Sequence, residues 1–280
     1  MMGRVLVTGG TGFVGHALVQ ALKARGAELR CVIRSGSRAR LEGLDANDQV
    51  VEVDDLFAQD ADWWRDTCRD IDMVIHAAWY AEPGKYLTSP RNMACLIGTL
   101  QMAEGAAEAG VRRVVGVGTC FEYDFTDGYL HPDTALAPAT PYAAAKAAAY
   151  TMLNAYLPAR GVSFLWARLF YLYGPREDSR RLVPHLHQQL GAGAAADLTS
   201  GAQLRDFMDV RDAARLLVED AMGTRSGATN ICSETPITIR ALAEGIADQY
   251  GRRDLLKFGA RADNLTDPAM IVGRRERKQP

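Results

Sequence analysis

The chain has 280 residues, 48% hydrophobic and 24% charged, and this balance excludes a largely disordered protein. The 32 basic and 34 acidic side chains nearly cancel, which is unlike a protein that binds nucleic acid through a broad basic face. Because no apolar run approaches the roughly 20 residues of a membrane-spanning helix, we expect neither nucleic acid nor a membrane among the partners.

Short β-branched runs alternate with helical stretches through the first part of the chain. The runs are Val5–Val7, Leu29–Ile33, Val50–Val53, Met73–Ile75, Val114–Val117 and Phe164–Ala167. Helical candidates between them include His16–Arg25 and Pro90–Ala109. Continuous apolar strands that alternate with helices predict an α/β fold with a doubly wound parallel sheet of the Rossmann type.

The pattern changes after Gly174 and Pro175, where the predicted elements become shorter. One further amphipathic helix is predicted over Ile237–Tyr250, introduced by Thr238. We expect residues 1–173, joined by roughly 205–231, to form the dinucleotide-binding domain. Residues 174–204 and 232–280 would then form a small C-terminal substrate-binding lobe over the carboxyl ends of the strands. The basic end of the chain reads as a solvated tail, with Arg274, Arg275, Arg277 and Lys278.

Cysteine and histidine usage indicates the compartment and the absence of a metal. The five cysteines are scattered without a C-x-x-C pair, which is typical of reduced thiols. Residues 4–9 already read as a strand entering a turn, so we expect no signal peptide. His185 and His187 form H-x-H without a third ligand nearby, which favours a helix-surface pair. The sequence thus predicts a cytoplasmic protein with no metal site.

Three glycines follow the first strand at a spacing that suits a dinucleotide. Gly9 permits a tight turn, Gly12 permits close approach of the backbone to a pyrophosphate, and Gly15 permits close packing of helix and strand. The N-terminus of the next helix offers free N–H groups and partial positive charge to the phosphates. A tight turn with no ligand is the alternative, but the strand–turn–helix context favours a dinucleotide site.

The end of the second strand bears on the choice between NAD and NADP. An acid there would bind the 2′-hydroxyl of NAD, whereas an arginine can bind the 2′-phosphate of NADP. The strand is followed by Arg34, Ser35 and Arg38, which favours NADP, with solvated surface arginines as the alternative. Asp55 and Leu56, after the third strand, are expected to border the adenine, although an Asp there is also a common turn residue.

Tyr142 and Lys146 form a Y-x-x-x-K pair on an alanine-rich helix that begins at Thr140 and Pro141. The i, i+4 spacing places the phenol and the ammonium on one face of that helix. A nearby ammonium favours phenolate, so we expect Lys146 to lower the pKa of Tyr142 and suit it to acid/base chemistry. Thr119, at the end of the fifth strand, can offer its hydroxyl to the same substrate oxygen.

Together these motifs resemble the extended short-chain dehydrogenases/reductases that act on sugar nucleotides. The matching segments occur in the family's order and span nearly the whole chain: Thr8–Gly15, Asp72–Ala78, Gly118–Tyr123, Pro141–Lys146, Arg168–Pro175 and Gly201–Asp212. The resemblance implies that Tyr142 is the acid/base, that Lys146 binds the nicotinamide ribose and that Thr119 orients the substrate oxygen. It also implies further cofactor contacts, from Thr11, Phe13, Val14, Ala77, Ala78 and Phe170.

The resemblance implies substrate contacts as well. Arg205 matches an arginine that reaches the substrate diphosphate, and Arg261 is a second candidate or else an exposed surface arginine. Arg181 and Val183 belong to a segment similar to one that lines the nucleotide pocket. Trp79, in the loop after the fourth strand, could stack on a sugar or base, with ordinary packing as the alternative.

Several positions depart from the family's pattern. Dehydratases of this family carry an Asp-Glu pair after the threonine, where this chain has Cys120 and Phe121; these can still contact substrate but cannot supply the required acid and base. Tyr171 replaces an Asn that contacts substrate phosphates in many members. On the helix after the fourth strand, an Asn common in the family has no clean counterpart: Cys95 stands there, with Asn92 one turn earlier. These departures make a dehydratase an unfavoured prediction.

The sequence therefore predicts an NADP-dependent reductase of a nucleoside-diphosphate keto sugar, with the carbonyl at C4. An NAD-dependent nucleotide-sugar 4-epimerase is the main alternative, since it would use the same residues. A dinucleotide-sensing protein without turnover is a third reading, which the intact Thr119, Tyr142 and Lys146 disfavour. The helix beginning near Pro90 and the helix of Tyr142 are candidates for a homodimer interface, or else simply cover the sheet.

Overall fold

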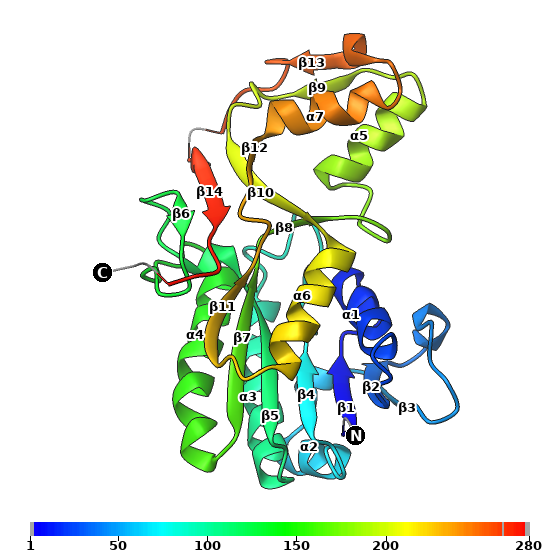
Figure 1. Cartoon of the computed structure of the whole chain (residues 1–280), viewed down its shortest axis with the longest axis vertical. Coiled ribbons are helices and arrows are strands. Elements are labelled where there is room, and N and C mark those ends of the chain that lie inside the picture. Colours follow the sequence, from blue (N-terminus) through cyan, green and yellow to red (C-terminus); the bar gives the residue numbers. More distant parts are fainter. Residues whose placement is uncertain (1–2, 265, 278–280) are drawn as a thin grey trace.

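The computed structural model describes residues 3–264 and 266–277. Its centre is a parallel sheet of seven strands in the order β11-β7-β5-β4-β1-β2-β3 (Figure 1). The strands are β1 (Val5–Thr8), β2 (Leu29–Arg34), β3 (Gln49–Val53), β4 (Met73–His76), β5 (Arg113–Thr119), β7 (Ser163–Leu169) and β11 (Gly227–Ile231). This sheet confirms the predicted doubly wound Rossmann fold.

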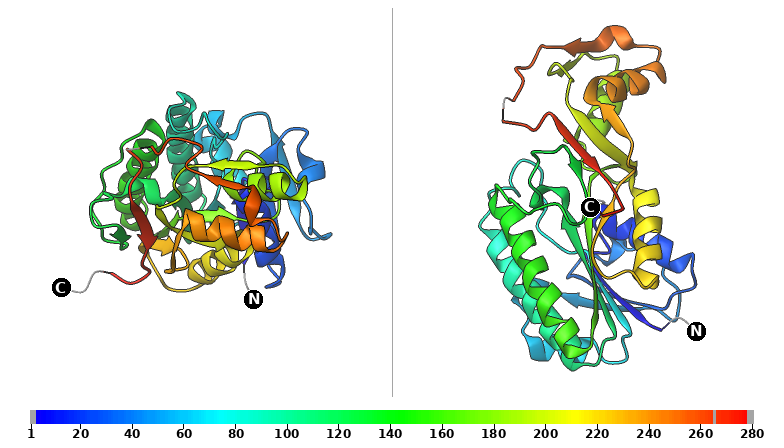
Figure 2. Two further views of the ribbon diagram at one scale, coloured as in Figure 1. Left: turned by 90° about the horizontal axis from the view of Figure 1, so that it is seen from above. Right: turned by 60° about the vertical axis from the view of Figure 1, so that its left-hand side comes forward.

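Helices cover both faces of the sheet (Figures 1 and 2). One face carries α1 (Phe13–Lys23) and α6 (Val210–Met222), and the other carries α2 (Ala61–Thr67), α3 (Arg91–Glu108) and α4 (Pro141–Tyr156). Because side chains alternate along a strand, each strand contributes to both layers, and continuous apolar runs result.

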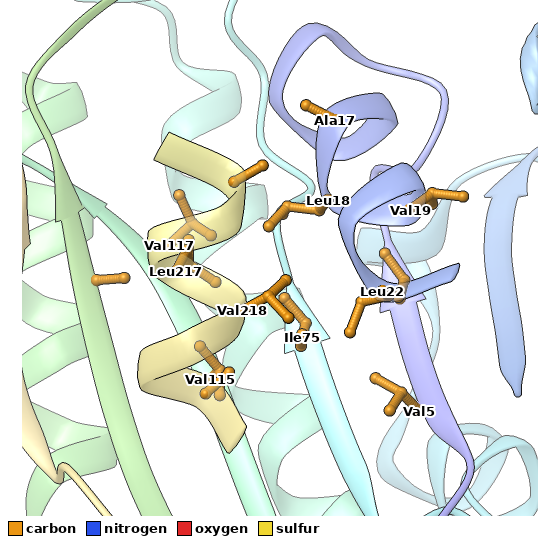
Figure 3. Close-up of a cluster of buried hydrophobic side chains, with 14 of the residues drawn as sticks. Val5, Ala17, Leu18, Val19, Leu22, Ile75, Val115, Val117, Leu217 and Val218 are labelled. Atoms are coloured by element: carbon orange, nitrogen blue, oxygen red, sulfur yellow. The ribbon is translucent and has the colours of Figure 1, made fainter. Parts of the chain in front are cut away.

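Strand β5 shows how the two cores divide the sequence. Val115 lies in the core under α1 and α6, where Leu18 and Val218 are fully buried (Figure 3). Its neighbour Val114 lies in the opposite core, with Trp64 and Met102. Burial of each such side chain contributes about 1.5–3 kcal/mol, so the sheet is a stable base for the residues at its edge.

Local capping explains where two functional helices begin. Thr140 accepts a hydrogen bond from the Ala143 N–H and Pro141 occupies the first turn, so α4 begins where the sequence predicted. Thr238 caps α7 (Ile239–Asp248) in the same way, which confirms the predicted late helix.

The chain beyond β7, together with β6, builds further small units. A five-stranded sheet has the order β12-β10-β14-β6, with β8 paired to β10. Its strands are β6 (Tyr129–Leu130), β8 (Tyr171–Tyr173), β10 (Leu204–Asp209), β12 (Pro236–Thr238) and β14 (Met270–Gly273). A separate layer, called here the C-terminal lobe, consists of α5 (Leu182–Gly191), α7 and the pair β9 (Ala196–Leu198) and β13 (Leu256–Phe258). The lobe lies beyond the carboxyl ends of the central strands and has its own apolar core (Figure 1).

Five short 3-10 helices complete the described secondary structure, and one of them, η3, follows strand β5 of the central sheet directly. They are η1 (Arg38–Arg40), η2 (Leu56–Ala58), η3 (Cys120–Glu122), η4 (Pro158–Arg160) and η5 (Arg253–Leu255).

The basic end of the chain is anchored, so the prediction of a solvated tail is wrong for its first residues. Arg275 donates to both carboxylate oxygens of Asp220 at 2.9 and 3.0 Å. Arg274 donates to the Glu234 carbonyl at 2.7 Å and stacks on the Tyr129 ring. Long-range pairing has overridden the local charge pattern here. Lys278 lies outside the described residues.

All five cysteines are free and buried. Among the described residues, no helix is both long and apolar enough to cross a membrane. The same residues contain no group of three or more His, Cys, Asp or Glu side chains that could hold a metal ion.

Candidate active site

The glycine turn between β1 and α1 leaves little room for side chains. Gly9 has a φ of 75°, and a Cβ on it would lie 2.7 Å from the Ala78 nitrogen. A Cβ on Gly15 would lie 2.0 Å from the Gly9 carbonyl oxygen, so helix and turn can pack this closely only with glycine there. Gly12 begins α1 without a side-chain cap, which leaves the N-terminal N–H groups for an anion.

The donors and the shape of this turn fit a dinucleotide pyrophosphate. Thr11, Phe13 and Val14 are half-buried around it. The neighbouring segment after β4 is held against the turn, because the Ala78 N–H donates to the Thr8 hydroxyl at 3.2 Å. Ala77 is the half-buried residue before it.

A histidine that the sequence reading overlooked fixes this junction. His76 is buried, and its ring bonds the hydroxyls of Thr8 at 2.9 Å and Thr99 at 3.0 Å. Burial lowers the pKa of His76 to about 3, with the nearby Lys146 charge as a smaller cause. The ring is therefore neutral and acts here as a rigid hydrogen-bonding spacer.

The predicted adenosine side is open. Arg34 ends β2, and Arg34, Ser35 and Arg38 are all exposed. Asp55 caps η2 by accepting from the Phe57 N–H at 2.9 Å, while Leu56 is half-buried. The exposed arginines can reach a ligand phosphate without breaking a buried contact.

Arg176 makes contacts across the adenosine side that the sequence did not predict. Arg176 has a φ of 71°, a left-handed backbone conformation that costs a non-glycine residue on the order of 1–3 kcal/mol. Its guanidinium bonds the His16 ring of α1 and donates to the Arg40 carbonyl at 3.1 Å. The segment after β8 is thereby tied to α1 and η1.

Tyr142 and Lys146 lie on α4 as predicted, and both are in close contact with aromatic rings. The Lys146 Nζ donates to the Val117 carbonyl at 2.5 Å and lies 3.9 Å from the centre of the Trp79 ring. The Tyr142 ring meets the Tyr86 ring edge-on at 4.8 Å. Lys146 is buried and Tyr142 is half-buried, and these rings shield both from part of the solvent.

Burial dominates the ionisation of both groups. It lowers the pKa of Lys146 to about 7, against the opposing charge of Glu122. It raises the pKa of Tyr142 above the usual value, although a hydrogen bond with Thr119 acts in the opposite direction. The pKa of Tyr142 thus moves in the direction opposite to the prediction, because desolvation is the largest cause and the Lys146 ammonium donates to the Val117 carbonyl.

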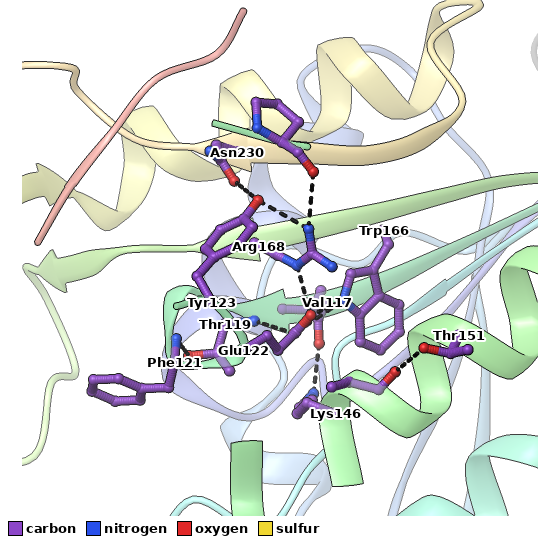
Figure 4. A network of polar contacts seen from close by, with 12 residues as sticks. Val117, Thr119, Phe121, Glu122, Tyr123, Lys146, Thr151, Trp166, Arg168 and Asn230 are labelled. Atoms are coloured by element: carbon purple, nitrogen blue, oxygen red, sulfur yellow. Dashed lines mark hydrogen bonds and ion pairs between the residues drawn. The ribbon is translucent and has the colours of Figure 1, made fainter. Parts of the chain in front are cut away.

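Thr119 ends β5 and begins η3, where its side chain and backbone are both held. Its hydroxyl lies near Tyr142, where it acts to lower the pKa of the phenol, and accepts from the Phe121 N–H at 3.3 Å. Its own N–H donates to the Glu122 carboxylate at 2.8 Å, which completes a capping box (Figure 4). The structure thus brings the three predicted catalytic side chains together and adds Glu122, which the sequence reading missed.

The predicted substrate side is mostly apolar. Cys120 and Phe170 are buried in one cluster, with Phe121 and Tyr171 packed against it. Burial raises the pKa of the Cys120 thiol to about 12, so it stays protonated. The Phe121 and Tyr171 rings meet edge-on at 6.2 Å.

Arg205 is close to this cluster but is already engaged. It is 3% exposed, pairs with Asp267 at 2.7 Å and stacks on the Tyr171 ring at 5.5 Å. A ligand diphosphate would have to share this guanidinium with Asp267. Arg261, by contrast, is exposed on the turn after β13, where its N–H bonds the Leu198 carbonyl.

The loop after β4 contacts both members of the catalytic pair. Trp79 donates its indole N–H to Asn92 at 2.9 Å while its ring covers Lys146. Asn92 is itself buried and donates to the Tyr86 carbonyl at 2.7 Å, so the loop is fixed from inside. Trp79, predicted to stack on a sugar or base or else simply to pack, thus packs against Asn92 and Lys146.

Arg181 and Val183, at the beginning of α5, contact different parts of the molecule. The Arg181 guanidinium stacks on the Tyr86 ring at 5.3 Å, next to the catalytic helix. Val183 is 7% exposed and belongs to the apolar core of the C-terminal lobe. On the same helix His187 bonds the Tyr250 hydroxyl at 3.0 Å.

Fold, glycine turn and Tyr-Lys pair together define the class of protein. The family model for the NAD dependent epimerase/dehydratase family matches residues 5–230, and the chain belongs to that family. It is an extended short-chain dehydrogenase/reductase, an enzyme that modifies nucleotide sugars by NAD-dependent oxidoreductase or epimerase chemistry.

Two curated relatives show the range within the family. The chain is 24% identical to a dTDP-6-deoxy-L-talose 4-dehydrogenase (NAD(+)) from Aggregatibacter actinomycetemcomitans, over 96% of this chain and 98% of the relative. It is 28% identical to UDP-glucuronic acid decarboxylase 1 from Danio rerio, over 91% of this chain but only 62% of the relative.

Solved structures agree on the fold. A dTDP-glucose 4,6-dehydratase from Streptomyces venezuelae, with NAD bound, is similar with a TM-score of 0.79 and 26% identity, covering 98% of this chain and 88% of that one. A UDP-glucose 4-epimerase from Thermotoga maritima has a TM-score of 0.84 at 19% identity, covering 97% and 90%, and this likeness concerns the fold alone.

Proposed function

We propose that the protein is an NADP-dependent reductase of a nucleoside-diphosphate sugar that carries a keto group at C4. The observation that carries this proposal is that the Thr119 hydroxyl lies close enough to Tyr142 to influence the phenol, with Lys146 one turn further along α4. A bound nicotinamide supplies the hydride. The protein's own side chains bind the carbonyl oxygen and protonate it.

The site can protonate the sugar oxygen. The Tyr142 phenol is protonated near neutral pH and can donate its proton to that oxygen as negative charge develops on it. The Thr119 hydroxyl binds the same oxygen. The Lys146 ammonium adds positive charge where negative charge develops on that oxygen, and the aromatic rings around it exclude water.

Cys120 and Phe121 argue against a dehydratase. Elimination of water from the sugar requires a second acid and base next to the threonine, and neither a buried thiol nor a phenyl ring supplies them. Simple hydride transfer needs only the Tyr142 proton. The relative named as a 4-dehydrogenase supports the same position on the sugar.

The cofactor assignment rests on the exposed arginines at the end of β2. Arg34, assisted by Ser35 and Arg38, would bind the 2′-phosphate of NADP, and Asp55 with Leu56 would border the adenine. The NAD named for the talose relative favours the second candidate, an enzyme that uses NAD. With a retained NAD, the same catalytic residues would perform 4-epimerisation.

The substrate diphosphate would be bound between the apolar cluster and the C-terminal lobe. Arg181, which stacks on Tyr86, and Arg205, which stacks on Tyr171, would bind it, and Arg261 would act from the lobe. Cys120, Phe121 and Tyr171 would form the wall against the sugar.

We also propose a homodimer in the cytoplasm, joined through α3 and α4. Three large apolar side chains of these helices are exposed: Met93 at 64%, Ile97 at 53% and Met152 at 49%. Such side chains gathered on neighbouring helices favour burial against a second copy.

The test has two stages. Titration with NADPH and with NADH, followed by nicotinamide fluorescence, measures the cofactor preference. Incubation with NADP⁺ or NAD⁺ and dTDP-6-deoxy-L-talose, and separately with UDP-glucose, dTDP-glucose and UDP-glucuronate, then identifies the reaction by product analysis. Reduced nicotinamide formed from the talose compound supports a C4 oxidoreductase. Epimerised UDP-glucose without net redox change would replace this proposal by the epimerase.

A further inference from the structure

Glu122 is a fully buried carboxylate that lies directly beneath Thr119. Its exposure is 0%, and its carboxylate accepts hydrogen bonds from three residues. The Thr119 N–H donates to Oε1 at 2.8 Å and the Arg168 Nε donates to Oε2 at 2.6 Å. The indole N–H of Trp166 lies 3.0 Å from both oxygens (Figure 4).

The strand before Thr119 is shaped to admit this carboxylate. A Cβ on Gly118 would lie 2.6 Å from the Glu122 Oε1 and 2.2 Å from the Trp166 Nε1. A Cβ on Gly116 would lie 2.3 Å from the Trp166 ring. Any side chain at these two positions of β5 would therefore displace the carboxylate or the indole. The two glycines leave the room that both groups occupy.

Arg168 makes further contacts besides the one to Glu122. Its Nη1 donates to the Tyr123 hydroxyl at 2.9 Å, and Tyr123 in turn donates to Asn230 at 2.7 Å. The guanidinium also lies 4.5 Å from the centre of the Tyr150 ring. Its Nη2 is buried with no hydrogen-bond partner among the described residues.

Stability alone is a weak explanation for this pair. Replacing a buried ion pair by packed apolar residues is often neutral or stabilising, because desolvation of two charges offsets their attraction. The unpaired Nη2 adds a further cost. A role in fixing the geometry of the adjoining turn accounts for the position of the carboxylate at Thr119.

We propose that Glu122 is a positioning residue that holds Thr119 in the orientation from which its hydroxyl reaches Tyr142, with Arg168 holding the carboxylate in turn. This rests on the proposed function, in which Thr119 binds the substrate oxygen. Its action is through the backbone: the carboxylate fixes the Thr119 N–H and thereby the turn η3, from which the side chain projects.

The substitution Glu122→Gln tests this with little change of volume. All three partners are donors, so the amide nitrogen of glutamine must face one of them. The charged Arg168 retains the amide oxygen because hydrogen bonds to charged groups are the stronger ones. The Thr119 N–H then faces another donor and loses its acceptor.

Two further variants complete the experiment. Tyr123→Phe is the matched control, since it removes a buried hydroxyl of the same network but leaves all three donors to the Glu122 carboxylate in place. Thr119→Ala, alone and combined with Glu122→Gln, forms a double-mutant cycle. Each variant is measured for melting temperature, for NAD(P)H affinity, for kcat and KM on the nucleotide sugar that the native protein turns over, and for amide exchange of the peptide containing Thr119.

Glu122→Gln is expected to lower kcat by about 10–100-fold, since a small misplacement of a catalytic group has effects of this size. Cofactor affinity and KM should stay within about threefold, and kcat of Tyr123→Phe within about twofold of the native value. In the Thr119→Ala background, Glu122→Gln should have almost no further effect on kcat. A native kcat in Glu122→Gln, or additive losses in the cycle, would overturn the proposal.

The exchange measurement separates this proposal from the proposed function. Faster exchange of the Thr119 amide in Glu122→Gln than in Tyr123→Phe supports the positioning contact whether or not any sugar is turned over. Equal exchange in the two variants overturns it. If the native protein turns over none of the nucleotide sugars, the proposed function fails, and the exchange result still decides whether Glu122 holds the turn.

Discussion

The two ends of the proposed cofactor site differ in how much of the molecule surrounds them. At the catalytic end, Lys146 is 3% exposed and is bound by a carbonyl on one side and an indole ring on another. At the adenosine end, Arg34 and Arg38 are exposed. Chemistry here depends on a buried environment built by the whole fold, whereas cofactor preference depends on surface side chains that can change at little cost to stability.

The largest effect that we expect at the catalytic end is that of a substitution at Tyr142. Tyr142→Phe removes the proposed proton donor and keeps the ring that packs on Tyr86, so kcat should fall about 10²–10⁴-fold with the fold intact. Steady-state kinetics measure the loss, and NAD(P)H titration provides the control, because the affinity should change little. Full turnover by this variant would refute the acid/base assignment.

Burial of the catalytic end also predicts a pH dependence of stability. The pKa of Lys146 is about 7 in the folded chain, against an ordinary 10.5. Between these values the unfolded chain binds a proton that the folded chain does not, so the free energy of unfolding should rise with pH from 7 to 9. Relative to Lys146→Met, the native chain should gain about 1–3 kcal/mol over this interval.

Urea unfolding of both proteins at pH 7 and pH 9 measures this difference. Lys146→Met keeps the length of the side chain without a titrating group, so effects of other residues cancel in the comparison. Parallel pH dependences would show that the folded chain keeps Lys146 charged up to its ordinary pKa.

At the exposed adenosine end, we expect substitutions to change the preference between NADPH and NADH rather than the stability of the fold. Arg34→Gln should weaken NADPH binding about 10–100-fold, the value of a charge-assisted contact to phosphate, and NADH binding less than about threefold. Arg40→Gln is the matched control, because Arg40 contacts Arg176 through its carbonyl only. Titrations monitored by nicotinamide fluorescence measure both. Equal losses of affinity for NADPH and NADH would show that Arg34 does not bind the 2′-phosphate.

The smallest expected effect concerns Trp79. Trp79→Phe keeps an aromatic ring beside Lys146 but removes the indole N–H that bonds Asn92, so kcat should fall about 2–10-fold. Trp79→Leu also removes the cation–π contact and should lose more. Single-turnover rates distinguish the two variants. An unchanged rate in Trp79→Leu would show that the ring is only packing.

The central sheet and the catalytic helix could be predicted because their signals are local. Six apolar runs marked strands of the central sheet, Thr140 and Pro141 marked the start of α4, and the spacing of Tyr142 and Lys146 placed both on one face. The Rossmann fold and the family follow from such short-range patterns, since each is written in consecutive residues.

The environment of the catalytic pair could not be read in the same way. Glu122 is one of many acids in the sequence, and its partner Arg168 is 46 residues away. The direction of the Tyr142 pKa depends on how completely the site is buried, which no spacing reveals. Arg275 likewise looked like part of a tail because its partner Asp220 is 55 residues distant.

The strand order has a consequence for biosynthesis. Strands β1 to β7 of the central sheet are complete by Leu169, but the outermost strand β11 begins only at Gly227, after the first part of the C-terminal lobe. A nascent chain that has emerged only as far as β7 therefore presents that strand as an unpaired edge, open to association with other chains. Correct assembly requires β11 to reach this edge before another strand does.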